Sequence, residues 1–193
     1  IDLTTAQQWL GGVNAGREPP ERILLAALLS KAVALALHAF PEMNGFYQDG
    51  AFRPSKPIHL GTAIAIRGGG LVAPAIRDAD TLTLDGLMAA LRDLVARTRT
   101  GRLRSSELFD PTITVSSLGE RGVERLYGVI YPPQVAIVGF GTPAPLPRVV
   151  DGKVEPRLMV TATLAADHRV SDGHRGALFL LEIERQLQQP DKL

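Results

Sequence analysis

The sequence of 193 residues contains no cysteine. This absence excludes disulfides, zinc sites built on thiolates and a cysteine nucleophile. It also suits a reducing compartment, so we expect a cytoplasmic protein. An excess of charge of either sign is missing as well, since 21 basic side chains stand against 20 acidic ones. Nothing in this balance points to nucleic acid or an anionic membrane as a partner.

Long apolar runs and internal repeats are also missing. Lys31 and His38 interrupt the longest apolar stretch, which therefore falls short of the ~18 to 20 residues of a membrane span. No signal-peptide pattern opens the chain. The chain starts at Ile1 rather than Met, so we expect a domain taken from a longer protein. A hydrophobic content of 45% in 193 residues fits one domain with a well-buried core.

Helix-type and strand-type segments are mixed along the chain without a regular alternation. Apolar spacing and start signals predict helices over residues 2–10 (capped by Thr4 or Thr5 and weakened or stopped at Gly11-Gly12), 20–40, 83–99 and 175–187. Strands are predicted over residues 58–66, 71–76, 112–117, 135–140 and 157–164, with hairpin turns at Asp49-Gly50 (within 45–54) and Asp151-Gly152. We therefore predict an α/β fold, a two-layer sandwich of a mixed β-sheet with helices packed on it.

Three polar features have structural interpretations. The glycine-rich stretch 67–70 lacks the Lys-Ser/Thr ending of a phosphate loop, so we expect a tight turn between two strands. The basic cluster is interpreted as a solvated helix end, with a seat for an anionic ligand as the alternative; it comprises Arg97, Arg99, Arg102 and Arg104. We expect His38 to be a capping or core histidine and His59 to be a structural residue at a strand start.

A titratable stretch lies between the last predicted strand and the last predicted helix. It holds His168, Asp172 and Gly173 in a His-x-x-x-Asp-Gly pattern. Histidine takes and returns a proton near neutral pH, and a carboxylate four residues later can orient a base or hold a turn. An ordinary loop histidine beside an Asp-Gly turn is the alternative. The order strand, loop, helix predicts that His168 lies at the end of a sheet strand, where α/β proteins commonly hold reacting groups.

Three segments together resemble the catalytic domain of the dihydrolipoamide acyltransferases, the second components of the 2-oxo acid dehydrogenase complexes. They are Asp167-His-Arg-Val-Ser-Asp-Gly173, Thr114-Val-Ser-Ser-Leu-Gly119 and Pro132-Pro-Gln-Val-Ala-Ile-Val-Gly139. The resemblance covers nearly the whole chain, although chloramphenicol acetyltransferase and peptide-synthetase condensation domains share the His-x-x-x-Asp-Gly pattern. The family's basic helical lead-in, lipoyl domain and peripheral-subunit-binding domain are not found here, so we expect residues 1–193 to be a single catalytic domain from a longer chain that carries them.

The resemblance implies acyl transfer between a dihydrolipoyl thiol, carried on a separate domain, and the substrate coenzyme A. Acetyl and branched-chain acyl groups are favoured. His168 would be the general base and Ser116 the oxyanion donor, with Ser117 as the fallback. Asp172 would either support His168 or hold the loop, and Arg169 is a candidate partner for it. His174 is expected in the first turn of a helix, and no metal site is expected.

The resemblance also implies a homotrimer in which His168 of one chain meets Ser116 of the next. Larger cage-like cores, with bound dehydrogenase and dihydrolipoamide dehydrogenase components, are known in the family. We expect the apolar segments 20–40 and 135–140 to be buried partly between chains. Two alternatives stay open: a structural core protein without catalysis, and an O-acetyltransferase of the chloramphenicol type.

Overall fold

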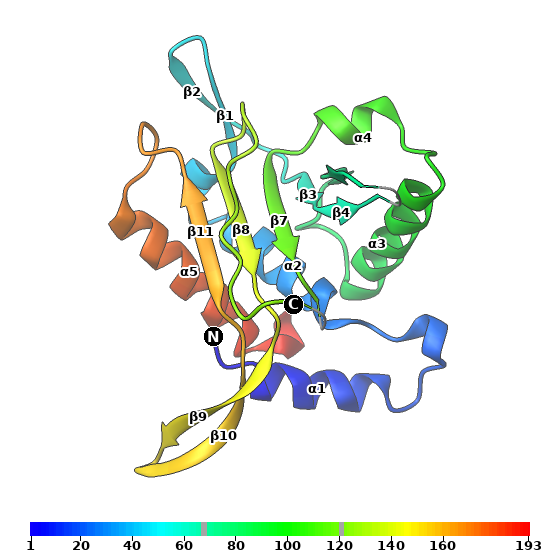
Figure 1. Cartoon of the computed structure of the whole chain (residues 1–193), viewed down its shortest axis with the longest axis vertical. Helices are drawn as coiled ribbons and strands as arrows, with labels where there is room; N and C mark the ends of the chain where they lie inside the picture. Colours follow the sequence, from blue (N-terminus) through cyan, green and yellow to red (C-terminus); the bar gives the residue numbers. More distant parts are fainter. Residues whose placement is uncertain (67–68, 120–121) are drawn as a thin grey trace.

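The computed structural model describes residues 1–66, 69–119 and 122–193 (Figure 1). The α-helices are α1 (Thr4–Asn14), α2 (Leu25–Ala36), α3 (Leu84–Arg99), α4 (Ser105–Phe109) and α5 (Gly173–Leu187), and the 3-10 turns are η1 (Pro19–Glu21), η2 (Pro41–Met43) and η3 (Pro190–Lys192). The strands are β1 (Gly45–Gln48), β2 (Ala51–Pro54), β3 (Leu60–Thr62), β4 (Ile64–Ala65), β5 (Leu71–Val72), β6 (Ala75–Ile76), β7 (Ile113–Ser117), β8 (Ala136–Phe140), β9 (Ala144–Val150), β10 (Lys153–Met159) and β11 (Ala162–Ala166).

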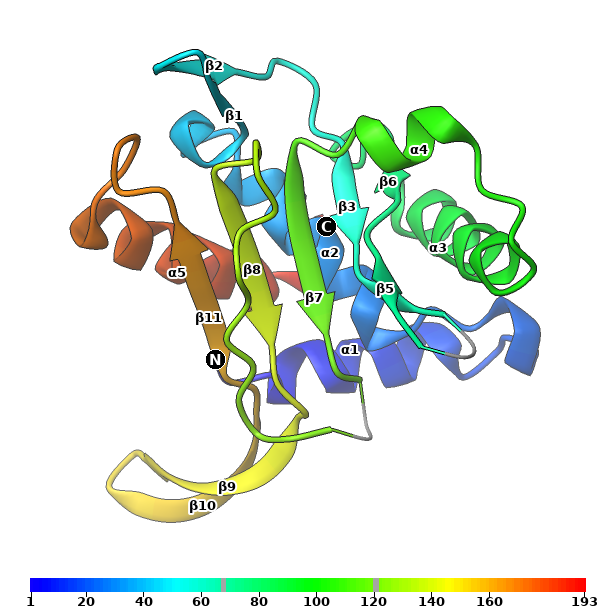
Figure 2. The ribbon, with the colours of Figure 1, turned by 45° about the horizontal axis from the view of Figure 1, so that its top comes forward.

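A five-stranded mixed sheet in the order β11-β8-β7-β3-β6 forms the frame of the molecule. β7 is parallel to β3 and β8, whereas β6 and β11 are antiparallel to their neighbours. Every residue of β8 is buried, as its continuous apolar sequence predicts for a central strand. Figure 2 shows α2 and α5 behind one face of this sheet and the segment that leads into β8, residues 122–135, on the other. The predicted mixed α/β architecture is confirmed.

The clearest local signals are confirmed at α3 and at the two hairpins. α3 begins directly after Thr83, whose Oγ1 accepts a hydrogen bond from the Gly86 N–H at 3.1 Å. The turns of both predicted hairpins have positive φ at their two central residues, as the two-residue hairpin turn with Asp-Gly requires. These contacts lie within a few residues of each other in sequence, so local reasoning suffices for them.

The helix predicted over residues 20–40 is shorter at both ends, because α2 ends at Ala36 and a turn follows over residues 37–39. α2 begins at Leu25, because residues 22–24 are extended after the turn η1. Asn14 supplies the physical reason. Its side-chain amide accepts from the Ile23 N–H at 2.9 Å and donates to the Ile23 carbonyl at 2.8 Å, which satisfies both backbone groups without a helix.

The helix predicted over residues 2–10 is longer than expected. α1 continues through Gly11-Gly12 to Asn14, so these glycines do not stop it, and its N-cap is Leu3 rather than Thr4 or Thr5 as predicted. A glycine weakens a helix by roughly 1 kcal/mol without ending it. The Asp2 carboxylate binds the Thr4 N–H at 2.8 Å and so supports the first turn from outside the helix.

The strands predicted over 58–66, 71–76 and 157–164 each divide between two structural elements. At the first, the Ala63 N–H bonds to the Val115 carbonyl at 3.0 Å, and the chain then leaves the main sheet. β4 and β5 pair with each other outside that sheet. The turn predicted over residues 67–70 falls partly on 67–68, which lie outside the described residues.

The apolar segments expected to face another chain are mostly covered within this one. Nine residues of α2 and all of β8 are buried, which contradicts the expectation for these two elements, whereas Leu24, just before α2, is 55% exposed. Exposed apolar side chains occur instead in the segment 122–131 between β7 and β8, where Val123 is 63%, Tyr127 75%, Val129 83% and Tyr131 53% exposed. No helix in the described part of the chain is long and apolar enough to cross a bilayer.

One charged side chain is buried in α2. Lys31 Nζ donates to the carbonyls of Asp80 and Leu82 at 2.6 and 2.5 Å, and so ties α2 to the loop before α3. Burial lowers the pKa of Lys31. Lys31→Met leaves both carbonyls without this donor, so we expect the free energy of unfolding to fall by about 2–4 kcal/mol, measured by urea denaturation. The matched control is Lys56→Met at an exposed lysine, which should stay within about 0.5 kcal/mol of the wild type; equal values for the two variants would contradict the bridging role.

Candidate functional site

The His168 loop, residues 167–172, connects β11 to α5. The N–H groups of Val170 and Ser171 donate to the Asp167 carbonyl at 2.9 and 3.1 Å and close a compact turn. His168 is exposed in this turn, just beyond the carboxyl end of β11, as the sequence predicts. No hydrogen bond to another described residue holds its imidazole, so its position depends on the backbone on either side.

Asp172 has a definite structural contact. It is the N-cap of α5, and its Oδ1 accepts the Arg175 N–H at 2.8 Å. That backbone N–H lowers the pKa of the Asp172 carboxyl below its usual value. His174 lies in the first turn of α5 and is exposed, as expected.

Arg169 pairs with Asp167 and not with Asp172, so the partner predicted for it was wrong. The guanidinium donates from Nε and Nη2 to both carboxylate oxygens of Asp167, at 2.9 and 2.6 Å for the shorter contacts. This planar pairing lowers the pKa of Asp167. The Arg169 guanidinium also lies over the Tyr47 ring, 3.7 Å from its centroid.

An open depression of about 550 Å³ surrounds the loop. Apart from Val170, its lining is charged or polar: Glu42, His168, Arg169, Ser171, Asp172 and Arg175. Arg175 Nε donates to Glu42 Oε1 at 2.6 Å, and the guanidinium lies 4.6 Å from the Phe40 ring centroid. The first turn of α5 is thereby attached to η2 and to Phe40, which lies between α2 and η2.

The two adjacent serines of β7 face opposite sides of the sheet. Val115 and Ser117 line an apolar cavity of about 610 Å³ near α2 and α3. Side chains alternate along a strand, so Ser116 faces the other side, together with Thr114. Ser117 Oγ accepts the Gly119 N–H at 3.3 Å in the following turn. Ser117 therefore faces the cavity near α2 and α3, whereas Ser116 lies on the face of the sheet away from these helices.

Ser116 lies in one row across the sheet with Gly139 of β8 and Thr163 of β11. On the same face, Thr163 Oγ1 donates to the Leu126 carbonyl, which belongs to the segment 122–131. A Cβ on Gly139 would meet that carbonyl at 2.9 Å. The segment 122–131 therefore covers part of the face on which Ser116 lies.

His168 and Ser116 of one chain are not brought together. Five residues separate His168 from Thr163, at roughly 3.3 Å each along a strand, and two strand spacings of roughly 4.8 Å separate Thr163 from Ser116. The two side chains lie on the order of 15 Å or more apart, toward opposite ends of the sheet. Figure 2 shows the same arrangement, because β7 and β11 point in opposite directions.

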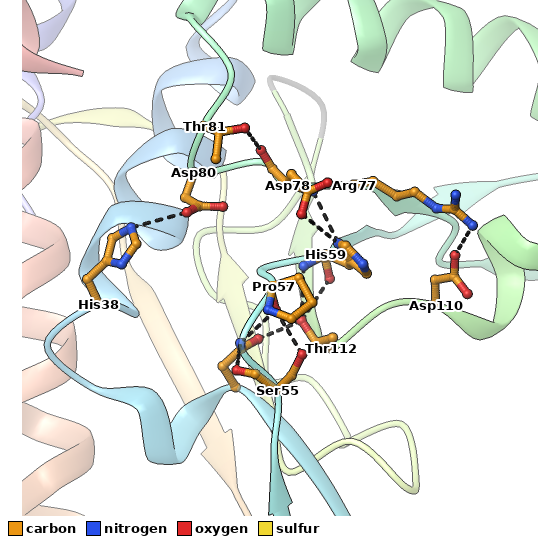
Figure 3. Close-up of polar contacts among 11 residues, drawn as sticks. His38, Ser55, Pro57, His59, Arg77, Asp78, Asp80, Thr81, Asp110 and Thr112 are labelled. Atoms are coloured by element: carbon orange, nitrogen blue, oxygen red, sulfur yellow. Dashed lines mark hydrogen bonds and ion pairs between the residues drawn. The ribbon is translucent and has the colours of Figure 1, made fainter.

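Two other histidines have structural contacts (Figure 3). His59 Nδ1 accepts the Asp78 N–H at 3.1 Å, in agreement with a structural role. His38 Nε2 lies 3.3 Å from Asp80 Oδ2 with a side chain that is 61% exposed, so the expected capping or core position was wrong. Among residues 1–66, 69–119 and 122–193, no three His, Asp or Glu side chains are grouped to hold a metal ion.

The basic cluster at the end of α3 is partly neutralised. Arg97 donates to Asp93 Oδ2 at 2.7 Å and to Glu107 Oε2 at 2.6 Å. These bonds favour the interpretation as a helix end. Tyr47 and Glu42, which contact the arginines beside His168, had no signal in the sequence, because their contacts join segments more than 100 residues apart.

The whole chain, residues 1–193, matches the family described as 2-oxoacid dehydrogenases acyltransferase (catalytic domain). It is 33% identical over 172 residues to the dihydrolipoyllysine-residue acetyltransferase component of the acetoin cleaving system of Bacillus subtilis (strain 168), covering 89% of this chain and 43% of that protein. It is 34% identical over 174 residues to the lipoamide acyltransferase component of the branched-chain alpha-keto acid dehydrogenase complex of Pseudomonas aeruginosa, covering 89% and 40%. The chain thus spans about two fifths of the length of these curated relatives.

Solved structures agree with this match. A structure of the Azotobacter vinelandii dihydrolipoamide acetyltransferase, studied for the catalytic roles of a serine, a histidine and an asparagine, superposes with a TM-score of 0.91 at 30% identity and covers 100% of this chain and 81% of that one. The cubic core of a pyruvate dehydrogenase multienzyme complex gives the same TM-score, identity and coverage. Chloramphenicol acetyltransferase, at 16% identity and a TM-score of 0.62 over 97% of this chain and 85% of that one, shares the fold. The chain belongs to the family of the acyltransferase catalytic domains of 2-oxoacid dehydrogenases.

Proposed function

We propose that this domain transfers an acyl group, acetyl or branched-chain, between a dihydrolipoyl thiol and coenzyme A. His168 is the general base and Ser116 the oxyanion donor. One observation carries the assignment. In the Azotobacter vinelandii protein the serine precedes the histidine by 52 residues and the asparagine follows it by four, and Ser116, His168 and Asp172 have the same two spacings.

The loop geometry suits His168 for proton transfer. A free thiol has a pKa of about 8.5 and is mostly protonated at neutral pH, so a base against it raises the fraction of attacking thiolate. His168 takes the proton as the coenzyme A sulfur attacks the carbonyl carbon of the acyl-dihydrolipoyl thioester. When the tetrahedral intermediate collapses and its bond to the dihydrolipoyl sulfur breaks, His168 returns the proton to that sulfur. No nucleophilic side chain is needed, which agrees with a chain that has no cysteine.

The Ser116 hydroxyl would stabilise the negative charge on the thioester oxygen in the intermediate. A single well-placed donor of this kind is worth about 3–4 kcal/mol of barrier. The two side chains of one chain are too far apart to act on one carbonyl. The site we propose therefore combines His168 of one protomer with Ser116 of its neighbour.

We propose a closed homotrimer as the assembly that forms these shared sites. The exposed apolar side chains of the segment 122–131 lie on the Ser116 face and are the surface we assign to the neighbouring chain. A heterologous contact that closes into a ring leaves no free surface for further growth. The match to a cubic core supports a larger cage built from such trimers.

The rest of the protein is also proposed from the relatives. We infer that residues 1–193 form a single domain that follows lipoyl and subunit-binding domains in the complete chain. Its partners are then the dehydrogenase and dihydrolipoamide dehydrogenase components of a complex. A cytoplasmic location stays a prediction.

The test is an acyl-transfer assay with a panel of acyl-CoA donors and two acceptors, dihydrolipoamide and chloramphenicol. Acetyl-CoA or a branched-chain acyl-CoA should react with dihydrolipoamide, while succinyl-CoA reacts poorly. Transfer only to the hydroxyl of chloramphenicol would replace the proposal with O-acetylation. A well-folded protein without transfer to either acceptor would leave a structural core protein.

Variants of Asp172 separate its capping contact from its charge. Asn caps a helix as well as Asp does, whereas Ala does not. Asp172→Asn should therefore keep the melting temperature and retain kcat within roughly threefold, and Asp172→Ala should melt several degrees lower. Calorimetry and initial rates measure the two effects. A large loss of kcat in Asp172→Asn at an unchanged melting temperature would show that the charge itself supports His168.

A further inference from the structure

Tyr47 of β1 and the Asp167–Arg169 pair form a contact network around His168 that the proposed reaction does not yet use. Asp167 and Arg169 are the two sequence neighbours of His168. The Arg169 N–H, Nε and Nη2 all bond to the Asp167 carboxylate, at 3.0, 2.9 and 2.6 Å. A side chain that bonds across His168 in this way restricts the backbone on both sides of it.

The ion pair alone is a weak restraint. The Arg169 side chain is 62% exposed, and exposed ion pairs contribute little because water competes for both partners. The Tyr47 ring strengthens this restraint. A planar guanidinium stacks on an aromatic face, and the 3.7 Å between Arg169 Cζ and the ring centroid is within the range of such contacts. The ring fixes the plane in which Arg169 meets Asp167.

Tyr47 is itself held by two hydrogen bonds. The Tyr47 hydroxyl donates to the Gly50 carbonyl at 3.0 Å, and the Tyr47 N–H donates to the Pro133 carbonyl at 2.8 Å. The Asp167 N–H donates to the Val135 carbonyl at 2.8 Å. Tyr47 and Asp167 are therefore anchored to the same short stretch just before β8, residues 133–135, and Arg169 bridges these two anchored residues.

We propose that Tyr47 is a positioning residue for the acyl-transfer reaction, acting on His168 through Arg169 and Asp167. This inference rests on the proposed role of His168 as the base. Tyr47 takes no part in the proton transfer itself, and its hydroxyl bonds to the Gly50 carbonyl instead. Its ring keeps the loop in the one conformation that aims the imidazole, which otherwise has no hydrogen-bond partner among the described residues.

Tyr47→Leu removes the aromatic face, and Tyr47→Phe keeps it while removing the bond to Gly50. Tyr47→Leu should lower kcat by roughly 10- to 100-fold, because small misplacements of a reacting group are costly. The KM values for coenzyme A and dihydrolipoamide should change by less than about twofold, because Tyr47 affects aim more than binding. Tyr47→Phe should retain kcat within roughly twofold. Melting temperature and oligomeric mass are measured for each variant.

A double-mutant cycle supplies the readout that a merely structural role would not change. In the His168→Ala background, Tyr47→Leu should cause no further loss, because the residue that it positions is gone. Equal losses in both backgrounds would overturn the inference, as would a Tyr47→Phe variant as slow as Tyr47→Leu. If Tyr47→Leu does not fold, Arg169→Lys replaces it: lysine keeps the charge but neither the planar pairing nor the stacking, and it should show the same loss of kcat.

The outcomes distinguish this inference from the proposed function. A His168→Ala variant with normal turnover would remove the base and the inference together. An inactive His168→Ala variant combined with a fully active Tyr47→Leu variant would overturn the role of Tyr47 alone.

Discussion

His168→Ala is expected to lower the rate of acyl transfer at least 100-fold while the protein keeps its fold. A general base contributes roughly 10²- to 10⁴-fold to a rate, and His168 is the side chain that we propose accepts the thiol proton. The loss should appear in kcat and in kcat/KM. Because His168 is exposed and has no hydrogen-bond partner among the described residues, its truncation opens no cavity in the core. Stopped assays with dihydrolipoamide and the preferred acyl-CoA measure the rate, and calorimetry measures the fold.

The matched control is His174→Ala. This histidine is also exposed and lies six residues further on, in the first turn of α5. Its removal should leave turnover within a few-fold of the wild type. Near-normal turnover in a well-folded His168→Ala variant would remove His168 from the reaction.

Ser116→Ala is expected to lower kcat roughly 100- to 1,000-fold with a smaller change in KM, because an oxyanion donor acts chiefly in the transition state. Ser117→Ala is the control, since that serine faces the cavity near α2 and α3. A larger loss in Ser117→Ala than in Ser116→Ala would transfer the role to the neighbouring residue.

Combining the two inactive variants tests whether a site is shared between chains. Co-expressed His168→Ala and Ser116→Ala chains with different affinity tags should recover about a quarter of the wild-type activity, because each site in a random ring needs one chain of each kind in the right order. Each variant expressed alone gives the background. Activity no higher than that background in verified mixed oligomers would place both residues in one chain, and so would a fully active monomer in light scattering.

Local patterns predicted the parts of the fold that depend on neighbours in sequence. The helix after Thr83 and the Asp-Gly turns depend on contacts within three residues, and both were predicted correctly. The start of α2 was not, because Asn14 fixes Ile23 from the preceding helix. The split between β3 and β4 was missed for a similar reason, since the bond from Ala63 to Val115 crosses to another strand.

The candidate site divides in the same way. His168 and Asp172 are candidates from one short motif, and the structure places them in the loop and at the N-cap of α5. The alternation of side chains along β7 separates Ser116 from Ser117 once the helices are placed. The partner of Arg169 was misassigned, because spacing alone does not tell which carboxylate a loop arginine meets. Tyr47 lies in β1, 122 positions before Arg169, which lies in the loop after β11. No local pattern in the sequence therefore points to their contact.

Gly139 has a consequence for the contact between chains. It lies beside Ser116 in the sheet, and a Cβ there would meet Thr163 Oγ1 at 2.6 Å as well as the Leu126 carbonyl at 2.9 Å. Because Gly139 has no side chain, the segment 122–131 can contact the sheet backbone directly. The absent Cβ therefore sets the distance between this segment and the sheet. In the proposed trimer, the distance from the sheet at which Tyr127 and Val129 would meet a neighbouring protomer is thus set inside each chain, by a glycine that adds no side chain to this face of the sheet.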